Sequence, residues 1–490
     1  MRFSNLLPFA AAVTACADHD LSKRDEPEGL VLTGHINPNQ LSEYLYVPFE
    51  VKPGVTSMHF SYDYPDKDTN VLDIGLFDER GYQIEDAVNG SAGFRGWSFT
   101  VLDEFTISPS GATPSYIAGP IAPGTWHVVL GPRGSVDDGF DYEITIEFGY
   151  EKVEKYYSKA FAPTDLGMNE ARRARMDNDT DGQIWLRGDF HVHSIYSDGN
   201  YTPEEQVSNA IKQELDFFFF TEHNSHSGND VMGVFAPEGD DLLIGRGMEV
   251  TSRYGHWNAI GMERDHTIEW RYKPGDQAYA DAAEQVHRSG GIVSVNHPYM
   301  GCPECIWNLD PDYLYNDAME VWNGYETTDL NEPALALWQS LLVKGHRMTA
   351  IGGSDTHHPP SLIGKPTTMV KTTTLGQAAI SEGIKNRRVY IVDGPGMEID
   401  FTVKGDDVYA QVGDIVAAES FQGGVKAMLS VTGFTNVTAC FVTDAGYVQN
   451  ETVTEEAISL PIEAGVKFVR AEIRNSTQSL VGMTNPIYFE

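Results

Sequence analysis

The first part of the chain alternates regularly between hydrophobic and polar residues. Over residues 57–64 every second side chain is Met, Phe or Tyr, and residues 143–148 repeat the pattern with Ile and Phe. A period of two places one face of a strand on a core and the other in water. Turn signals such as Pro53-Gly54 separate these runs, and no helical pattern interrupts them. The pattern predicts a β-sandwich or jelly roll over residues 25–150.

A polar connector at residues 151–186 leads to a region in which short apolar runs alternate with helical patterns. The four phenylalanines at 217–220 are typical of a strand buried on both faces. Thr202, Pro203 and Glu205 occupy the N-cap, N1 and N3 positions of a predicted helix. Repeated strand–helix units predict an α/β barrel or parallel sheet over residues 187–395. We expect strands at 184–193, 216–221, 242–250, 291–295, 318–322 and 348–351, and helices at 203–215, 276–288, 331–345 and 376–386.

Period-two alternation returns in the last part of the chain, for example over residues 467–474. It predicts a smaller C-terminal β domain at 396–490. The composition is strongly acidic, with 34 Lys and Arg against 71 Asp and Glu, which gives a formal charge of −37. Such a chain repels phosphate backbones and anionic lipids, so we expect no nucleic-acid partner and no membrane partner.

The first residues have the features of a secretory leader. Arg2 precedes a short apolar run that ends in Ala15-Cys16-Ala17, which predicts a signal peptide at 1–17. The dibasic Lys23-Arg24 predicts removal of a propeptide at 18–24; the alternative is a bacterial lipobox ending at Cys16. Six N-x-[ST] sequons exceed chance expectation and favour a secreted glycoprotein. They begin at Asn89, Asn178, Asn200, Asn436, Asn450 and Asn475.

Three cysteines remain once the leader is removed: Cys302, Cys305 and Cys440. The spacing of Cys302 and Cys305 is compatible with half of a zinc site, a redox pair or a small disulfide loop. No second pair is present to complete a zinc site, and a secreted protein matures in an oxidising compartment. We therefore expect a Cys302–Cys305 disulfide, and Cys440 as a buried free thiol.

Histidines and acidic residues follow nearly every predicted strand between 187 and 395. Because the carboxyl ends of barrel strands converge on one mouth, these side chains should meet there. The two imidazoles of an H-x-H sequence on a strand face the same side, and imidazole with carboxylate suits Zn, Mn or Fe. We predict two or three divalent metal ions. The nine candidate ligands are His191, His193, Asp198, His223, Glu249, His256, His297, Asp355 and His357.

The motifs that hold these residues resemble those of the polymerase and histidinol phosphatase (PHP) superfamily, in the same order. They are Gly188–Gly199, Thr221–Asn224, Gly247–Thr251 with His256, Asn296–Pro298 and Gly353–His357. Residues 185–189 and 484–488 look like the CehA/McbA-like branch. The resemblance implies a distorted (β/α)7 barrel, usually with three metal ions. By position, His191, His193, Glu249 and Asp355 would hold one ion, Glu249, His256 and His297 a second, and Asp198, His223 and His357 the third.

Such cations would lower the pKa of a bridging water and clamp the oxygens of a phosphate ester. We expect a secreted phosphoesterase acting on a small phosphomonoester or phosphodiester. His358 and His226 are candidate general acids, and Arg246 could supply positive charge.

Three alternative functions remain open at this stage. The same metal-activated water would attack a carbamate, ester or amide, and the CehA/McbA-like branch includes carbamate cleavage. A non-catalytic protein could instead contact glycan or cell wall through its β domains. An amidohydrolase barrel also opens with H-x-H, but it usually ends with a lone Asp, whereas Asp355 and His357 both stand at the last site here.

Overall fold

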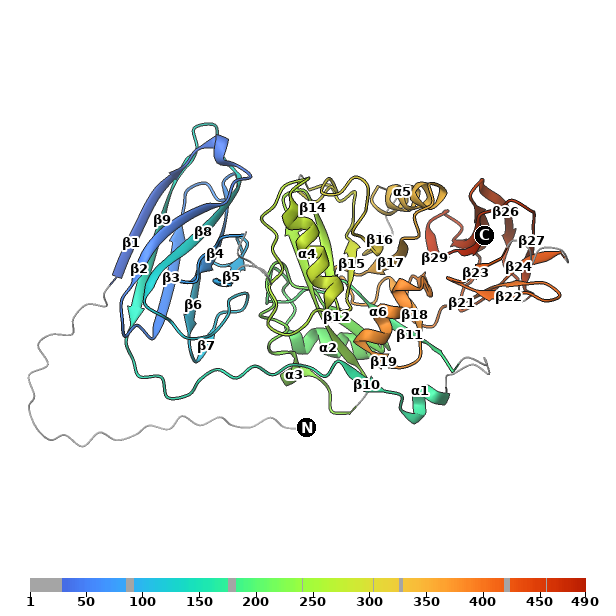
Figure 1. The fold of residues 1–490 in the computed structure, drawn as a ribbon, viewed down its shortest axis with the longest axis horizontal. Coiled ribbons are helices and arrows are strands. Elements are labelled where there is room, and N and C mark those ends of the chain that lie inside the picture. The colour runs from blue at the N-terminus through green and yellow to red at the C-terminus, as the bar shows by residue number, and fades with distance from the viewer. Residues whose placement is uncertain are drawn as a thin grey trace, which may run out of the picture.

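The computed structural model describes residues 29–84, 92–174, 182–239, 241–302, 304–325, 329–417, 424–454 and 456–490. Three regions follow one another along the long axis of the molecule: an N-terminal β region, a central region that carries most of the helices, and a C-terminal β region (Figure 1). The expected leader, the propeptide, Asn89 and Asn178 lie outside the described residues. Among the helices of the described residues, none has the length and apolar character needed to cross a membrane.

The N-terminal region is built from two antiparallel sheets, ordered β1-β9-β3-β6-β7 and β2-β8-β4-β5. Met58, Phe60 and Tyr62 of β3 are buried in one core with Ile144 and Ile146 of β9, as the alternation predicts. The strands are β1 (Gly29–Ile36), β2 (Leu45–Val51), β3 (Ser57–Asp63), β4 (Val71–Phe77), β5 (Phe94–Ser98), β6 (Glu104–Ser108), β7 (Gly111–Ala112), β8 (Gly124–Gly134) and β9 (Phe140–Gly149).

The central region is a curled mixed sheet in the order β17-β16-β15-β14-β13-β12-β11-β18. Its strands are β11 (Ile184–Asp189), β12 (Phe217–Phe220), β13 (Leu243–Ser252), β14 (Gly255–Ile260), β15 (Ile292–Val295), β16 (Ala318–Asn323), β17 (Thr349–Gly353) and β18 (Thr367–Thr372). Its main helices are α2 (Pro203–Lys212), α4 (Gln277–Arg288), α5 (Asn331–Val343) and α6 (Gln377–Lys385), and each confirms a predicted helix. The connectors contain β10 (Asp165–Gly167), α1 (Glu170–Ala174), α3 (Met232–Phe235) and β19 (Leu375–Gly376).

The sheet differs from the (β/α)7 barrel that the family resemblance implies. β11, β12 and β13 are parallel, as are β15, β16 and β17, but β14 runs antiparallel to both of its neighbours and β18 antiparallel to β11. The physical reason is the two-residue turn Arg253-Tyr254 between β13 and β14, which leaves no room for a crossover helix.

The two ends of this sheet approach one another without a regular ladder in the described residues. The Thr368 hydroxyl of β18 accepts from the Gly352 N–H of β17 at 2.9 Å and donates to the Gly352 carbonyl at 2.8 Å. Beyond the strand ends, the Asp355 N–H donates to the His191 carbonyl at 2.8 Å. These contacts bring the segment after β17 beside the segment after β11, so residues distant in sequence share one edge of the sheet.

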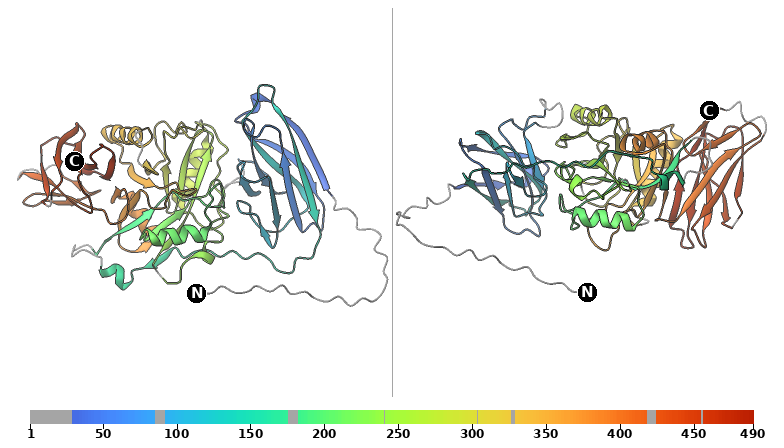
Figure 2. Two further views of the ribbon diagram at one scale, coloured as in Figure 1. Left: turned by 180° about the vertical axis from the view of Figure 1, so that it is seen from behind. Right: turned by 90° about the horizontal axis from the view of Figure 1, so that it is seen from below.

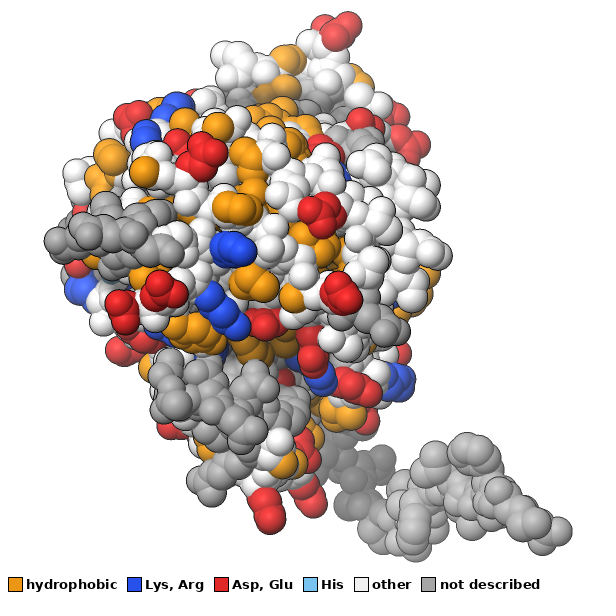
Figure 3. Space-filling model, turned by 90° about the vertical axis from the view of Figure 1, so that its right-hand side faces the viewer, with side chains coloured by type: hydrophobic (Ala, Val, Ile, Leu, Met, Phe, Trp, Pro, Cys, Tyr) orange, Lys and Arg blue, Asp and Glu red, His pale blue; other side chains and the backbone are white. Residues whose placement is uncertain are grey.

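The C-terminal region continues the same sheet through β20-β29-β28-β25-β26 and adds a second sheet, β22-β21-β24-β27. The three regions lie in a row in all views (Figure 2), and on the C-terminal end of the molecule hydrophobic side chains are interspersed with acidic and basic ones (Figure 3). The strands are β20 (Val389–Val392), β21 (Glu398–Lys404), β22 (Tyr409–Gln411), β23 (Ile415–Val416), β24 (Val425–Thr432), β25 (Thr438–Thr443), β26 (Gly446–Thr452), β27 (Ile458–Ile462), β28 (Phe468–Arg474), β29 (Leu480–Thr484) and β30 (Ile487–Phe489).

Candidate metal centre

The nine candidate ligands meet at one edge of the central sheet. Most follow the carboxyl ends of parallel strands, which converge there. His256 reaches the same edge from the start of β14, because an antiparallel strand begins where its neighbours end. Within the described residues, three overlapping groups have ligand atoms all within 4.8 Å of one another. The groups are His193, Asp198, His223 and His357; His191, Glu249 and His297; and His191, His193 and Asp355.

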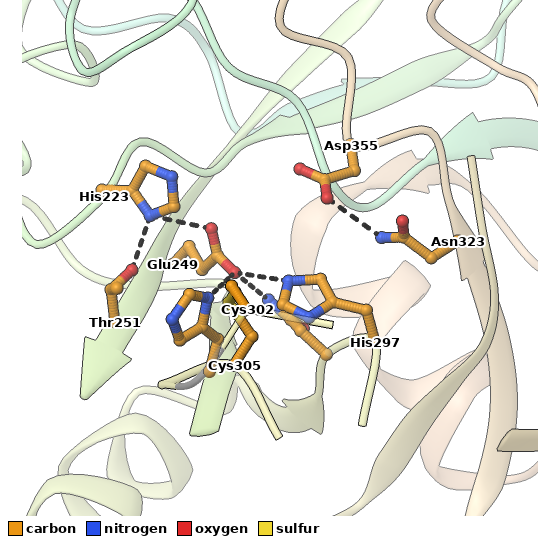
Figure 4. Close-up of a disulfide and its surroundings, with 10 residues drawn as sticks. His223, Glu249, Thr251, His297, Cys302, Cys305, Asn323 and Asp355 are labelled. Atoms are coloured by element: carbon orange, nitrogen blue, oxygen red, sulfur yellow. Dashed lines mark hydrogen bonds and ion pairs between the residues drawn. A yellow bond between two sulfur atoms is a disulfide. The ribbon is translucent and has the colours of Figure 1, made fainter. Parts of the chain in front are cut away.

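Glu249 lies at the middle of the cluster, between His223 and His297 (Figure 4), and its carboxylate contacts five imidazoles. Its Oε2 lies 3.2, 3.3 and 2.9 Å from ring nitrogens of His191, His193 and His223. Its Oε1 lies 3.2 Å from His256 Nδ1 and 3.1 Å from His297 Nε2. Burial opposes ionisation, but His223 and His191 hold the pKa of this carboxyl well below its usual range. Glu249 is therefore an ionised carboxylate that five imidazoles share.

Two further carboxylates complete the arrangement on either side. Asp355 Oδ1 lies 3.3 Å from His191 Nε2 and 3.2 Å from His193 Nε2. Asp198 Oδ1 lies 3.4 Å from His223 Nε2 and 3.2 Å from His357 Nε2.

The donor atoms fit divalent cations. Among the described residues, Nε2 of His191, Nε2 of His193, Oδ1 of Asp198 and Oε2 of Glu249 are buried without a hydrogen-bond partner, although each belongs to one of the three ligand groups. Buried polar atoms left this way are costly, whereas imidazole nitrogen and carboxylate oxygen are the preferred ligands of Zn, Mn and Fe. Burial also lowers the pKa of His256 to about 4, which keeps this ring in the neutral form that can bind a metal. The cluster can therefore hold divalent metal ions.

A layer of buried polar residues orients these ligands, and sequence reasoning missed it. Glu320 Oε1 lies 3.0 Å from Nδ1 of His191, and its Oε2 accepts from the His297 N–H at 3.0 Å and from the Asn323 amide at 2.9 Å. The Asn296 amide donates to Glu249 at 3.0 Å. A charged residue inside the apolar run of β16 is the signal that could have revealed Glu320.

Two of the candidate ligands have strained backbones. His297 has φ 22° and Asp355 has φ 50°, in the region that residues other than glycine rarely occupy. Such outliers persist where the surroundings determine them, and they occur often at functional sites. Here they turn the chain directly after β15 and β17, towards the cluster.

The three candidate catalytic side chains are not brought into the ligand groups. His358 is exposed, with Nδ1 3.0 Å from the Pro359 carbonyl. His226 is buried against Asp230 at 3.3 Å. Arg246 stands three residues before Glu249 on β13, an odd spacing that places it on the opposite face of the strand, where its Nε donates to the Met262 carbonyl at 2.9 Å. The structure therefore does not support Arg246 as a charge at this centre.

The cysteine predictions are confirmed. Cys302 and Cys305 form a disulfide beside the cluster (Figure 4). This disulfide loop contacts β14, the strand that carries His256, because the Gly255 N–H donates to the Glu304 carbonyl at 3.0 Å. Cys440 is a buried free thiol, and burial raises its pKa.

Comparison with known proteins yields structural neighbours alone. No family model matches the chain, and no curated protein matches it. A two-domain protein containing a predicted PHP-like metal-dependent phosphoesterase from Bacteroides vulgatus shares 20% identity, with 69% of this chain and 100% of that chain covered and a TM-score of 0.38. An amidohydrolase from Chromobacterium violaceum shares 17% sequence identity, with 36% of this chain and 89% of that chain covered and a TM-score of 0.28. A metal-dependent phosphoesterase from Bifidobacterium adolescentis shares 19% identity, with 36% of this chain and 91% of that chain covered and a TM-score of 0.27. Likenesses this distant carry no argument, and the conclusion about this chain rests on its own site.

Proposed function

We propose that this chain is a metal-dependent hydrolase of the PHP superfamily, acting as a phosphoesterase on a small phosphomonoester or phosphodiester. The observation that carries the proposal is the convergence of nine imidazole and carboxylate groups, with Glu249 at the middle of them. Their motifs resemble those of that superfamily and follow in the same order along the chain. The CehA/McbA-like branch is part of the proposal, on the resemblance of residues 185–189 and 484–488.

The charge of the ligand set favours an anionic substrate. Three of the nine groups are carboxylates, Asp198, Glu249 and Asp355, so neutral imidazoles leave a ligand charge of −3. Two divalent ions would give the centre +1 and three would give +3, in a protein whose formal charge is −37. When bound, such ions supply Lewis-acid charge that activates water and stabilises oxygens that become negative as the bond breaks.

The side chains of the protein would hold and orient this centre. Glu249, Asp355 and Asp198 would hold the ions together with the imidazoles that each carboxylate contacts. Glu320 accepts a hydrogen bond from His191 Nδ1–H, which leaves Nε2 free to face the centre and fixes the tautomer. The burial of His191, His193 and Glu249 keeps bulk water from the ligands.

A carbamate, ester or amide hydrolase is the second candidate. The observation that favours it is the C-terminal motif 484–488, which looks like that of the CehA/McbA-like branch and is hydrogen-bonded to the central sheet. Asn485 is fully buried, accepts from the Ala350 N–H at 2.8 Å and donates to the Ala350 carbonyl at 2.9 Å, joining this motif to the strand that precedes Asp355.

A panel of substrates separates the two candidates. Protein stripped with a chelator is reloaded with Zn, Mn or Fe and assayed on p-nitrophenyl phosphate, bis-p-nitrophenyl phosphate and a naphthyl carbamate. We expect metal-dependent release from a phosphate ester. His297→Gln should abolish it, whereas His287→Gln, which removes a histidine paired with Asp317 at 2.8 Å outside the centre, should not. Turnover of the carbamate alone would favour the second candidate, and turnover unaffected by verified metal removal would refute both.

Secretion and glycosylation belong to the same proposal. The leader and the sequons support an extracellular, glycosylated enzyme, and Asn200, Asn436 and Asn450 are exposed in the described residues. Asn200 lies beside the centre, because its N–H donates to the His357 carbonyl at 2.7 Å. An intact-mass comparison before and after enzymatic deglycosylation tests this. A glycan contact through the β domains would be tested by binding to insoluble cell-wall polysaccharide.

A further inference from the structure

The N-terminal sandwich reaches the metal centre through Phe99, directly after β5. The ring of Phe99 meets the ring of His223 edge-on, with centroids 4.9 Å apart and planes at 78°. Hydrogen bonds hold the sandwich at this position: Ser115 Oγ donates to the Tyr196 carbonyl at 2.9 Å, and Ser225 Oγ donates to the Ser115 carbonyl at 3.0 Å. The sandwich therefore supplies part of the wall beside His223.

Arg133, near the end of β8, packs against the same ring. Its guanidinium carbon lies 5.3 Å from the Phe99 centroid. Asp73, whose side chain is 2% exposed, fixes the group with two contacts, Nε to Oδ2 at 2.7 Å and Nη2 to Oδ1 at 2.9 Å. The Arg133 side chain keeps 32% of its surface exposed. Its Nη1 makes no hydrogen bond to the part of the chain that the structure describes, so a rigidly held cation presents free donors.

One of the charges that act on Arg133 belongs to a candidate ligand, Asp198. Burial lowers the pKa of Arg133, but Asp73, Glu304 and the candidate ligand Asp198 together raise it above its ordinary value. The neighbouring Arg253 differs, because it is buried and its Nη1 contacts Glu304 at 2.5 Å. Arg133 thus combines proximity to the centre, a fixed orientation and exposed N–H groups.

We propose that Arg133 is a specificity residue that binds a second anionic group of the substrate, a carboxylate, one aromatic ring away from the group that reacts. The inference rests on the proposed function, which places the reacting group at the metal cluster. A single ring, Phe99, separates the guanidinium from the candidate ligand His223. The paired N–H groups of the guanidinium match the two oxygens of a carboxylate. Because the ion pair with Asp73 already fixes the Arg133 side chain, substrate binding does not have to order it. The substrate class is therefore a phosphate ester whose leaving group carries a carboxylate.

Two phosphonates that the enzyme cannot hydrolyse test this by binding alone. Phenylphosphonate and 4-carboxyphenylphosphonate differ only in a carboxylate one ring away from phosphorus. We expect the metal-loaded protein to bind the carboxylated compound about tenfold more tightly in isothermal titration, the size of one hydrogen bond to a charged group. Arg133→Gln should remove the preference without changing metal content. Arg133→Lys keeps the positive charge but lacks the paired N–H groups, so it should retain part of the preference. This variant replaces Arg133→Gln in the test if glutamine disturbs the structure around Asp73.

Arg80→Gln is the matched control, because Arg80 pairs with Asp78 at 2.7 Å in the same sandwich and has no contact with a candidate ligand among the described residues. It should keep the full preference. A preference that survives Arg133→Gln, or one lost equally in Arg80→Gln, would overturn the inference, as would equal binding of both compounds by the unmodified protein. A preference that depends on Arg133 in a protein that hydrolyses no ester would overturn the proposed function alone. Failure to bind either compound would overturn both.

Discussion

Replacing Glu320 with glutamine tests whether the buried polar layer holds the metal ligands. The substitution keeps the size of the side chain and removes its charge. The Glu320 side chain is 1% exposed and accepts from the His191 ring and from the His297 N–H, each at 3.0 Å. Residues that orient metal ligands in this way typically contribute a factor of about 10–100 to metal affinity, or about 1.4–2.8 kcal/mol. Because Glu320 acts on two ligands at once, we expect a loss near the upper end of this range.

A competition titration measures the effect directly. The metal-free protein is titrated with Zn²⁺ in the presence of a chromophoric chelator, and the same titration is run on Glu320→Gln. The matched control is Glu332→Gln, which removes a carboxylate that pairs with Arg474 at 2.6 Å away from the centre. Thermal melting without metal shows separately how much each variant loses in stability.

The role of Glu320 in holding the ligands is refuted if Glu320→Gln binds Zn²⁺ within about threefold of the unmodified protein, a difference smaller than one orienting contact should cause. It is also refuted if Glu332→Gln weakens binding to the same degree, since the loss would then reflect general destabilisation.

Three other predictions concern separate parts of the molecule. Asp355→Asn should lower hydrolysis at least about a hundredfold with the melting temperature of the metal-free protein retained; an active variant would exclude Asp355 as a ligand. Burial opposes ionisation of Glu472, but Arg470 and Arg474 lower its pKa, so its stabilising effect is present at neutral pH and disappears as the pH falls through that lowered pKa. Glu472→Gln should therefore lower the free energy of unfolding by about 3–5 kcal/mol at pH 7 and by less in acid. Denaturant unfolding measures the difference in stability between the variant and the unmodified protein at each pH, and a difference that does not vary with pH would contradict this. Cys440, 3% exposed, should react with a maleimide only after denaturation, and rapid labelling of the native protein would contradict its burial.

Local features of the fold could be predicted because their causes are local. The helix at α2 begins where the sequence indicates: the Glu205 N–H donates to Thr202 Oγ at 3.2 Å, and the Thr202 N–H donates to the Glu205 carboxylate at 2.8 Å. The convergence of the candidate ligands could be predicted for the same reason, since most of them belong to short motifs at strand ends. The direction of β18 was not predictable in this way, because its antiparallel pairing with β11 joins segments distant in sequence. The antiparallel β14 follows instead from the two-residue turn after β13.

The residues that support the candidate ligands could not be predicted from the sequence. Glu320 supports His191 from 129 positions away, and nothing in the local pattern names its partner. Phe99 and Arg133 belong to another region of the fold altogether. Arg246 is different, because its odd spacing from Glu249 on one strand already places it on the opposite face from that ligand.

Anomalous diffraction shows whether the distant imidazoles and carboxylates of this chain meet around cations. Crystals grown with Zn²⁺ or Mn²⁺ are measured above and below the metal absorption edge. We expect two or three anomalous peaks at about 2.0–2.2 Å from nitrogen and oxygen atoms of the nine candidate ligands, with Glu249 shared between two of them. A centre with no peak, or peaks bound only elsewhere on the protein, would contradict this expectation.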